Sequence, residues 1–302
     1  MRTPLILLLT AAIACALPAV LESGYFINVA IIALIYVILA SSLDIMMGWT
    51  GKFSFAHAAF FGIGAYTAAM MQRSFGTDLW VHLPAGMASA ALFGVLLGLP
   101  SLRLQGHFLA IMSIAFQTVV YLVLAQWTDV TGGHYGLSVE VSPELANVST
   151  FYFVTLGCTL VACLFVWFLT HSRFGDTLTA IRDDETLART IGMDTNIVKI
   201  IAFAISSALA GGAGVLMAHH IRGVTPNDYT VMTSATIVAM AVLGGRGKFW
   251  GPVVGALILT ILPEVLSDLA EYKHIMYGAL LIFMIMVMPQ GVVGALAGRK
   301  AK

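Results

Sequence analysis

The segment SRFGDTLTAIRDDETLARTIGMDTNIVK, residues 172–199, is the most polar stretch of an otherwise apolar chain. It carries nine of the thirty charged side chains, whereas the 302-residue chain as a whole is 59% hydrophobic and only 10% charged. Soluble domains are about 25% charged, and this chain has a mean hydropathy of +0.93. The composition therefore indicates a membrane protein in which residues 172–199 lie outside the lipid.

Runs without Asp, Glu, Lys or Arg mark the expected membrane spans, because about 20 apolar residues cross a hydrocarbon core about 30 Å thick. Ten such runs predict an all-α, polytopic helical bundle that forms a single domain over residues 1–302. The runs are 3–21, 23–43, 53–72, 79–102, 104–128, 145–172, 200–221, 229–245, 249–263 and 274–298. The two short runs, 229–245 and 249–263, form either a re-entrant hairpin or two short spans. We expect the first run to be retained as a helix, although its Ala-Cys-Ala at 14–16 also fits a cleaved signal peptide.

Lys and Arg are distributed unequally between the two sides that ten crossings create, and cytoplasmic loops carry the excess in membrane proteins. One side holds only Arg73, Arg222 and Lys273 of the fifteen basic residues. The other twelve fall on the side of residues 172–199: Arg2, Lys52, Arg103, Arg173, Arg182, Arg189, Lys199, Arg246, Lys248, Arg299, Lys300 and Lys302. We therefore expect residues 172–199 and both termini in the cytoplasm.

Several classes of function find no support in the residues. The net charge is zero and the pI is about 7.1, without the basic footprint of a nucleic-acid-binding protein. The eight histidines are scattered, and no HExxH, GxSxG or CxxC motif occurs. The cysteines lie in apolar runs and form neither a disulfide framework nor a metal-ligand spacing: Cys15, Cys158 and Cys163. We expect this chain to perform no covalent chemistry and to bind no metal or cofactor.

Two glycine motifs, GWTGKF at 48–53 and GGRGKF at 244–249, share the pattern Gly-x-x-Gly-Lys-Phe. Both fall on the expected cytoplasmic side, six spans apart, and this indicates a weak internal repeat, a common feature of transport proteins. Neither has the GxxxxGK[ST] spacing of a phosphate-binding loop. We interpret their glycines as tight turns that allow close helix packing: Gly48, Gly51, Gly244 and Gly247.

The polar segment itself has a helical pattern. Four of its apolar residues fall close to one helical stripe: Leu178, Ile181, Ala188 and Ile191. Gly192 can end this helix, and Thr195 or Asn196 can cap the next one. The segment is therefore either a solvated connector or a short cytoplasmic helix that docks on a soluble partner.

Blocks of sequence across nearly the whole chain resemble the permeases of branched-chain amino acid ABC importers of the LIV-M type. The blocks are GWTGKFSFAHAAFFGIGAYTAA (48–69), LRLQGHFLAIMSIAF (102–116), TGGHYGLS (131–138), SRFGDTLTAIRDDETLARTIGMD (172–194), VLGGRGKFWGPVVGALILTILPE (242–264) and MPQGVVG (288–294). Their order and combination make the resemblance specific. It implies a bacterial inner-membrane subunit that pairs with a second, related permease, two cytoplasmic ATPase subunits and a periplasmic binding protein. ATP and Mg²⁺ would bind to the ATPase partners.

The resemblance also implies a role for the polar segment, because the corresponding loop of the family fits a cleft on the ATPase and transmits its closure. Residues 172–196 would be this ATPase-coupling loop. The segment departs from the general importer pattern Glu-Ala-Ala-x-x-x-Gly, since Glu185 is followed by Thr186 and Leu187 and lies seven residues before Gly192. The residues expected to carry the coupling are Arg173, Gly175, Arg182, Asp183, Asp184, Glu185, Ala188 and Gly192.

Polar residues in or beside the apolar runs are candidates for a translocation path or its gate, because a zwitterion in a low-dielectric core needs polar contacts. They are Asn28, Thr50, Ser54, His57, Gln117 and Thr233. Each can instead be an interhelical hydrogen-bonding residue. We expect those near the turn at 48–57 to line the route.

The expected function is import of branched-chain or related amino acids within an ABC complex. The nearest alternative is the same machine for urea, short amides or a sugar. A stand-alone secondary transporter or channel would need charges within the membrane for ion coupling, but Asp44 and Glu264 lie only at the ends of runs. An integral membrane enzyme would need a catalytic cluster that the sequence lacks.

Overall fold

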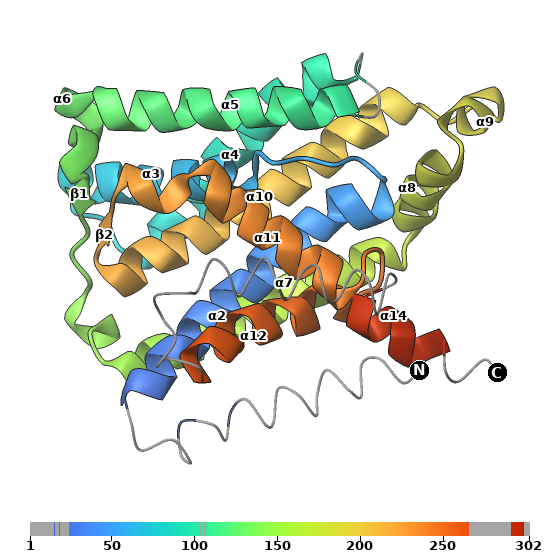
Figure 1. Ribbon diagram of the computed structural model, residues 1–302. Coiled ribbons are helices and arrows are strands. Elements are labelled where there is room, and N and C mark those ends of the chain that lie inside the picture. Colours follow the sequence, from blue (N-terminus) through green and yellow to red (C-terminus); the bar gives the residue numbers. More distant parts are fainter. Residues whose placement is uncertain are drawn as a thin grey trace.

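Figure 1 shows the computed structural model, which describes residues 15, 18, 24–102, 104, 107–265 and 291–298. The prediction of an all-α bundle is confirmed, with two strands of two residues each as the exception among the described residues. The first half contains α2 (Gly24–Asp44), the π-helical turn η1 (Ile45–Trp49), α3 (His57–Phe75), α4 (Leu79–Ser101), α5 (His107–Gln126), α6 (Thr128–Thr131), η2 (Gly133–Tyr135), β1 (Leu137–Ser138), η3 (Pro143–Leu145) and α7 (Val148–Thr170). The second half contains α8 (Arg173–Asp183), α9 (Glu185–Thr190), α10 (Thr195–Ile221), β2 (Gly223–Val224), η4 (Pro226–Tyr229), α11 (Val231–Gly244), α12 (Trp250–Val265) and α14 (Gly291–Gly298).

Five helices among the described residues are long and apolar enough to cross a membrane: Gly24–Trp49, Leu79–Ser101, Phe108–Gln126, Val148–Thr170 and Thr195–Ile221. Each corresponds to one of the predicted runs. At about 1.5 Å per residue, the 14 residues of α11 and the 16 of α12 reach only about 21 and 24 Å, less than a hydrocarbon core of about 30 Å. The count of ten spans therefore stays a prediction. The run at 3–21, except for residues 15 and 18, and residues 274–290 of the run at 274–298 lie outside the described residues.

The centre of the bundle is a three-helix unit in which α10 packs against α3 and α4. Glycine makes this packing close: a Cβ built on Gly64 of α3 would lie 2.1 Å from the carbonyl oxygen of Gly211 in α10. A Cβ on Gly211 would in turn lie 2.4 Å from the Cβ of Ala90 in α4. Lipid provides no hydrophobic force between helices, so such close contact between backbones is what holds them together.

A second group of helices surrounds this unit. The helix α2 packs against α7, α10 and α12, and α11 packs against α12. In Figure 1, α5 lies along one edge of the bundle. The strands β1 and β2 pair antiparallel, with Leu137 opposite Val224 and Ser138 opposite Gly223, and tie two loops together at one end. The helices α8 and α9 lie at the other end, so the bundle has two chemically different ends (Figure 1).

Three local predictions need correction. The run 53–72 does not begin as a helix, because residues 51–56 form a non-helical segment before α3. The apolar stripe in residues 172–199 does not belong to one helix, since the helix is interrupted at Asp184, between α8 and α9. Ile191, which was predicted to lie on the stripe, is 65% exposed. The residue that caps α10 is Asp194, whose carboxylate accepts a hydrogen bond from the backbone N–H of Ile197, and not Thr195 or Asn196.

Candidate functional site

The two Gly-x-x-Gly-Lys-Phe turns, far apart in sequence, meet at the end of the bundle that carries α8 and α9. Asp44, the last residue of α2, accepts hydrogen bonds from the backbone N–H of Gly247 at 3.0 and 3.2 Å. A Cβ on Gly48 would lie 2.3 Å from the nitrogen of Gly247, and one on Gly244 would lie 1.7 Å from the oxygen of Gly251. The turns therefore reach backbone contact only because they lack side chains at these positions.

The helix α8 is fastened to the first of these turns by Arg182. Its Nη1 donates to the carbonyl oxygen of Gly48 at 3.0 Å, and its Nε donates to Asp183 at 3.2 Å. Gly51 has a φ of +69°, and a Cβ there would lie 3.0 Å from Cγ of Arg182. In this chain the guanidinium thus binds within the protein rather than pointing freely towards a partner.

Glu185, the first residue of α9, joins three basic residues from different parts of the chain. Its carboxylate lies 2.6 Å from Nζ of Lys199, 2.7 Å from Nη2 of Arg189 and 3.2 Å from Nζ of Lys52. Partial burial by itself raises the pKa of Glu185, but the hydrogen bond from Lys199 and the charge of Lys52 outweigh it and lower the pKa from 4.5 to about 2. This cluster, which we call the Glu185 cluster, connects α9 to the first glycine turn and to the start of α10.

The two short helices have defined ends. The Asp184 carboxylate accepts hydrogen bonds from the backbone N–H groups of Thr186 and Leu187 and so caps α9. Gly192 has a φ of +87°, the left-handed conformation that follows many helix ends. Gly175 packs so closely that a Cβ would lie 2.3 Å from the oxygen of Thr170.

One face of α8 and α9 turns inward and the other is open. The side chains of Leu178, Ile181 and Ala188 are buried. Arg173 is exposed, as are the acid Asp183 and the apolar residues Leu187 and Ile191. This outer face therefore combines charged and apolar groups, as protein-binding surfaces do.

The non-helical segment between η1 and α3 contains two of the polar path candidates, Thr50 and Ser54, and a third, His57, follows it as the first residue of α3. Thr50 donates to the carbonyl oxygen of Met46 at 2.5 Å, and the Ser54 hydroxyl accepts from the backbone N–H of Ala56 at 3.3 Å. His57 is 1% exposed, and its Nε2 lies 2.9 Å from the hydroxyl of Ser42. Because Ser42 donates to the carbonyl oxygen of Leu39, we assign the proton of His57 to Nε2. Its buried Nδ1 is then an acceptor that has no hydrogen-bond partner among the described residues.

Side chains from α5 and α11 complete the polar surroundings of this segment. Ser113 of α5 accepts from the backbone N–H of Phe55 at 2.8 Å, and Ser234 of α11 accepts from that of Ala58 at 2.9 Å. Gln117 of α5 donates to the carbonyl oxygen of Tyr229 at 2.6 Å and accepts from Ser234 at 3.4 Å. Backbone that is neither helix nor strand must be satisfied in this way at membrane depth.

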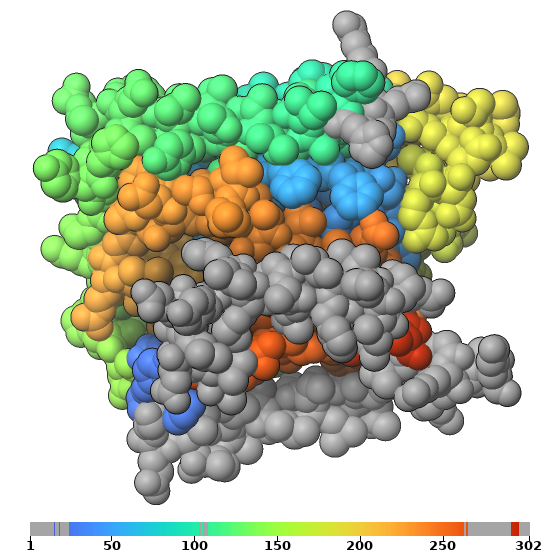
Figure 2. All heavy atoms as spheres, viewed as in Figure 1, coloured from blue at the N-terminus to red at the C-terminus, as the bar shows by residue number. Residues whose placement is uncertain are grey.

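The structure separates the predicted path residues into two groups. Thr50, Ser54, His57 and Gln117 are buried and surround the start of α3. Asn28 lies near the opposite end of α2, where it donates to the carbonyl oxygen of Gly24. Thr233, in the first turn of α11, donates to the carbonyl oxygen of Asp228 in η4. Figure 2 shows blue atoms of the chain region that contains residues 53–57 at the surface between α5, in green, and α11, in orange.

Sequence reasoning missed several polar partners in the site. Around the start of α3 these are Ser42 of α2, Ser113 of α5 and Ser234 of α11, and in the Glu185 cluster they are Lys52 and Lys199. It also missed a buried pair in which Nδ1 of His82 lies 3.2 Å from Nε2 of His219. The only available signal was the presence of polar residues within apolar runs, which does not reveal their partners. Among the residues that the structure describes, no three His, Cys, Asp or Glu side chains form a group that could hold a metal ion.

These features define a class. Apolar helices of membrane length, a polar and non-helical segment within the bundle, and a polar pair of helices at one end together describe an integral membrane transport protein.

Comparison with known sequences identifies the family. The profile of the family described as "Branched-chain amino acid transport system / permease component" matches residues 25–285, and the chain belongs to this family. The permease protein LivM of a high-affinity branched-chain amino acid transport system in Salmonella typhimurium is 32% identical, over 96% of this chain and 75% of the relative. LivM of Escherichia coli is 31% identical over the same shares of the two chains. LivH of Salmonella typhimurium, another permease protein of such a system, is 28% identical over 86% of this chain and 91% of LivH. No solved structure matches the chain.

The chain is therefore a permease component rather than an enzyme. It is similar to both LivM and LivH, which are permease proteins of branched-chain amino acid transport systems.

Proposed function

We propose that this chain is the inner-membrane permease subunit of a bacterial ATP-driven ABC importer for branched-chain or related amino acids, and that it forms the translocation path with a second, related permease. The observation that carries the proposal is a continuous connection. The Glu185 cluster and Arg182 join α8 and α9 to the turn at 48–53. This turn leads directly into the non-helical segment that precedes His57. A displacement of α8 and α9 would therefore reach the surroundings of His57 along the backbone of residues 48–57.

The outer face of α8 and α9 is the proposed contact with an ATPase subunit. Leu187 and Ile191 are 61% and 65% exposed on a part of the chain that lies outside the membrane spans. Exposed apolar residues of the α9 region, together with the exposed charged residues Arg173 and Asp183 of α8, suit a protein partner. ATP and Mg²⁺ bind to the two ATPase subunits in this proposal, and a periplasmic binding protein delivers the substrate at the end that carries β1 and β2.

The proposed orientation places α8, α9 and both termini in the cytoplasm. It is supported by the basic residues at that end of the described chain, among them Lys52, Arg173, Arg246 and Lys248. Single cysteines in a cysteine-free background test it. In intact cells, Asp183→Cys should be protected from an impermeant thiol reagent, and Glu140→Cys should react. Labelling of position 183 from outside the cell would contradict the proposed orientation.

The proposed path includes the surroundings of His57. The unpaired Nδ1 of His57 is an acceptor that can meet the ammonium group of a passing zwitterion. His57→Ala should lower uptake while the complex still assembles, whereas Asn28→Ala, at the far end of α2, should transport like the wild type. Normal uptake by His57→Ala would remove this residue from the path.

The function itself is tested with the assembled complex. The chain should co-purify with a second permease and ATPase subunits, and proteoliposomes should take up leucine, isoleucine or valine when the binding protein and ATP are supplied. The same assay with urea, short amides and sugars distinguishes the alternative substrates. Uptake without ATP or a binding protein would contradict the proposal and favour a stand-alone transporter.

A further inference from the structure

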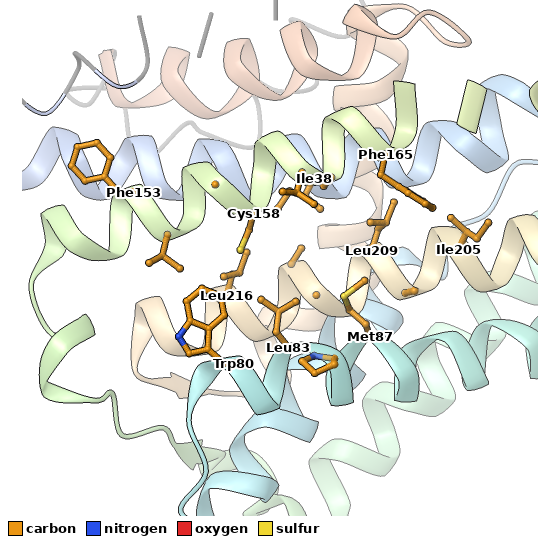
Figure 3. A pocket seen from close by; sticks show the side chains of 18 residues that line it. Ile38, Trp80, Leu83, Met87, Phe153, Cys158, Phe165, Ile205, Leu209 and Leu216 are labelled. Carbon is orange, nitrogen blue, oxygen red and sulfur yellow. The ribbon is translucent and has the colours of Figure 1, made fainter. Parts of the chain in front are cut away.

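An apolar groove runs along the side of the bundle between α4, α7 and α10, with Ile38 of α2 also lining it (Figure 3). Its volume is about 780 Å³. Trp80 and Phe153 lie towards one end of the groove, and Phe165 and Ile205 lie towards the other (Figure 3). None of the described side chains that line the groove is charged. The groove lies outside the Glu185 cluster and the surroundings of His57.

The length and lining of the groove suit an acyl chain. Along α7 the lining extends from Phe153 to Phe165, which is about 18 Å at about 1.5 Å per residue. Extended hydrocarbon can lie along a groove of this length and pack against its apolar side chains at about 4 Å.

The helices around the groove indicate that it opens to lipid. Leu79–Ser101, Val148–Thr170 and Thr195–Ile221 are all candidate membrane spans. A groove between membrane-spanning helices faces the hydrocarbon core of the bilayer, and lipid acyl chains are the molecules there that can fill it. Trp80, which is 64% exposed in the first turn of α4, lies at the level where tryptophan typically meets the membrane–water interface.

Trp80 also lines a second, polar hollow of about 510 Å³, so the two cavities adjoin at this residue. The lining of the polar hollow includes the carboxylates of Asp78, Glu140 and Glu144, and no Lys or Arg is among its described residues. A cationic group is favoured there, and an anionic headgroup is repelled. The apolar groove and the acidic hollow thus match the two chemically different parts of one lipid.

We propose that this site binds a phospholipid with an ammonium-bearing headgroup, of the phosphatidylethanolamine type. Its acyl chains fill the groove between α4, α7 and α10, and its ammonium group lies in the acidic hollow beside Trp80. The site is independent of the transported solute, so it stands whichever substrate the permease carries.

Gly157 of α7 provides a direct test, because it lines the groove and a Cβ built there has no atom within 4 Å. Gly157→Trp should fill the groove without displacing a neighbour, and Gly157→Leu is a smaller second variant. The control is Leu164→Trp on the same helix, at a residue that is 56% exposed and does not line the groove. The permease is purified with its associated subunits in mild detergent, and bound lipid is quantified by native mass spectrometry and lipid extraction. We expect about tenfold weaker retention of phosphatidylethanolamine in both Gly157 variants, equivalent to about 1.4 kcal/mol, and wild-type retention in Leu164→Trp.

Photocrosslinking identifies the occupant. Phosphatidylethanolamine with a photoreactive acyl chain should label peptides of α4 and α7 in the wild type, and Gly157→Trp should abolish this labelling. The combined change Glu140→Gln and Glu144→Gln should keep a lipid in the groove but remove its enrichment over phosphatidylglycerol. Equal lipid retention in all variants, or uniform labelling of every lipid-facing helix, would overturn the proposal. So would a crosslink from the groove to another subunit or to residues 3–21.

Discussion

The unit formed by α3, α4 and α10 and the end formed by α8 and α9 are held together by different forces. In the helical unit, glycine positions bring backbones into contact, as Gly64 and Gly211 do. At the α8–α9 end, hydrogen bonds and ion pairs of two long side chains, Arg182 and Glu185, add to the glycine contacts. The first kind of contact depends on shape and the second on charge.

This difference has consequences for movement. Close-packed backbones tolerate little displacement, because even one methyl group must find space. Ion pairs and hydrogen bonds at a partly exposed surface are each worth little and can be exchanged for water or for groups of a partner. We therefore expect the helical unit to move as one body and the α8–α9 end to shift against it.

The largest effect is expected from a variant that disrupts the glycine packing of the helical unit. Gly64→Val would place a side chain against the backbone oxygen of Gly211, which cannot rotate away. Overpacking typically costs about 1–3 kcal/mol and occasionally more, so this variant should accumulate poorly in the membrane and unfold at a lower temperature. Gly157→Ala, where a Cβ meets no atom within 4 Å, is the matched control and should behave like the wild type. Normal stability of Gly64→Val would contradict the packing of α3 on α10.

Removing the centre of the Glu185 cluster should have the next largest effect. Glu185→Ala leaves Lys199, whose side chain is 4% exposed, without its partner. Losing one partner of a fully buried pair costs about 3–5 kcal/mol, and the 21% exposure of Glu185 reduces the expected cost to about 2 kcal/mol. Thermal unfolding and proteolysis of the segment between α7 and α10 measure the loss.

A second change separates stability from coupling in this cluster. Adding Lys199→Met to Glu185→Ala removes the unpaired charge, so the double variant should recover most of the stability of the wild type. It should not recover uptake if the cluster transmits movement from α9 to the turn at 48–53. Recovery of both properties would show that the cluster serves stability alone.

A smaller effect is expected from backbone strain at Gly192. A Cβ there meets no atom within 4 Å, but its φ of +87° is unfavourable for other residues, so Gly192→Ala should cost about 1–2 kcal/mol. Gly76→Ala is a matched control, because Gly76 also has a positive φ, +59°, and free space but lies at the other end of the bundle. Both variants should lose similar stability, and only Gly192→Ala should weaken ATPase association or uptake. Equal uptake by the two variants would show that the end of α9 has no role in coupling ATPase movement to transport.

Acid should produce a gradual effect that is absent at neutral pH. Since the pKa of Glu185 is lowered from 4.5 to about 2, its contribution to stability is complete above pH 4.5 and is lost as the pH falls towards 2. The helical unit contains no such titrating contact in the packing of Gly64 on Gly211. Unfolding of the α8–α9 end followed from pH 7 to 3 should therefore show no change down to about pH 4.5 and a decline below it, which Glu185→Gln should not show.

Much of the fold could be predicted because hydropathy is a local property of the sequence. The runs at 23–43, 79–102, 104–128, 145–172 and 200–221 correspond to helices, and the glycine motifs were found by their repetition. The start of α3 was predicted four residues too early, because the apolar sequence of residues 53–56 does not show that the chain there is non-helical. The break at Asp184 was also missed, since one apolar stripe fits both one helix and two.

The sequence by itself determined that the protein lies in a membrane, where its five long apolar helices run, and that residues 172–199 are its most polar segment. It could do so because the cost of placing a charge or an apolar side chain in the wrong solvent is a property of that residue alone. Only the tertiary structure decided that Asp44 bonds to Gly247, that Arg182 bonds to Gly48, and that Glu185 gathers Lys52 and Lys199. These contacts join residues up to 203 positions apart, and their formation depends on how the helices pack rather than on the sequence around either partner.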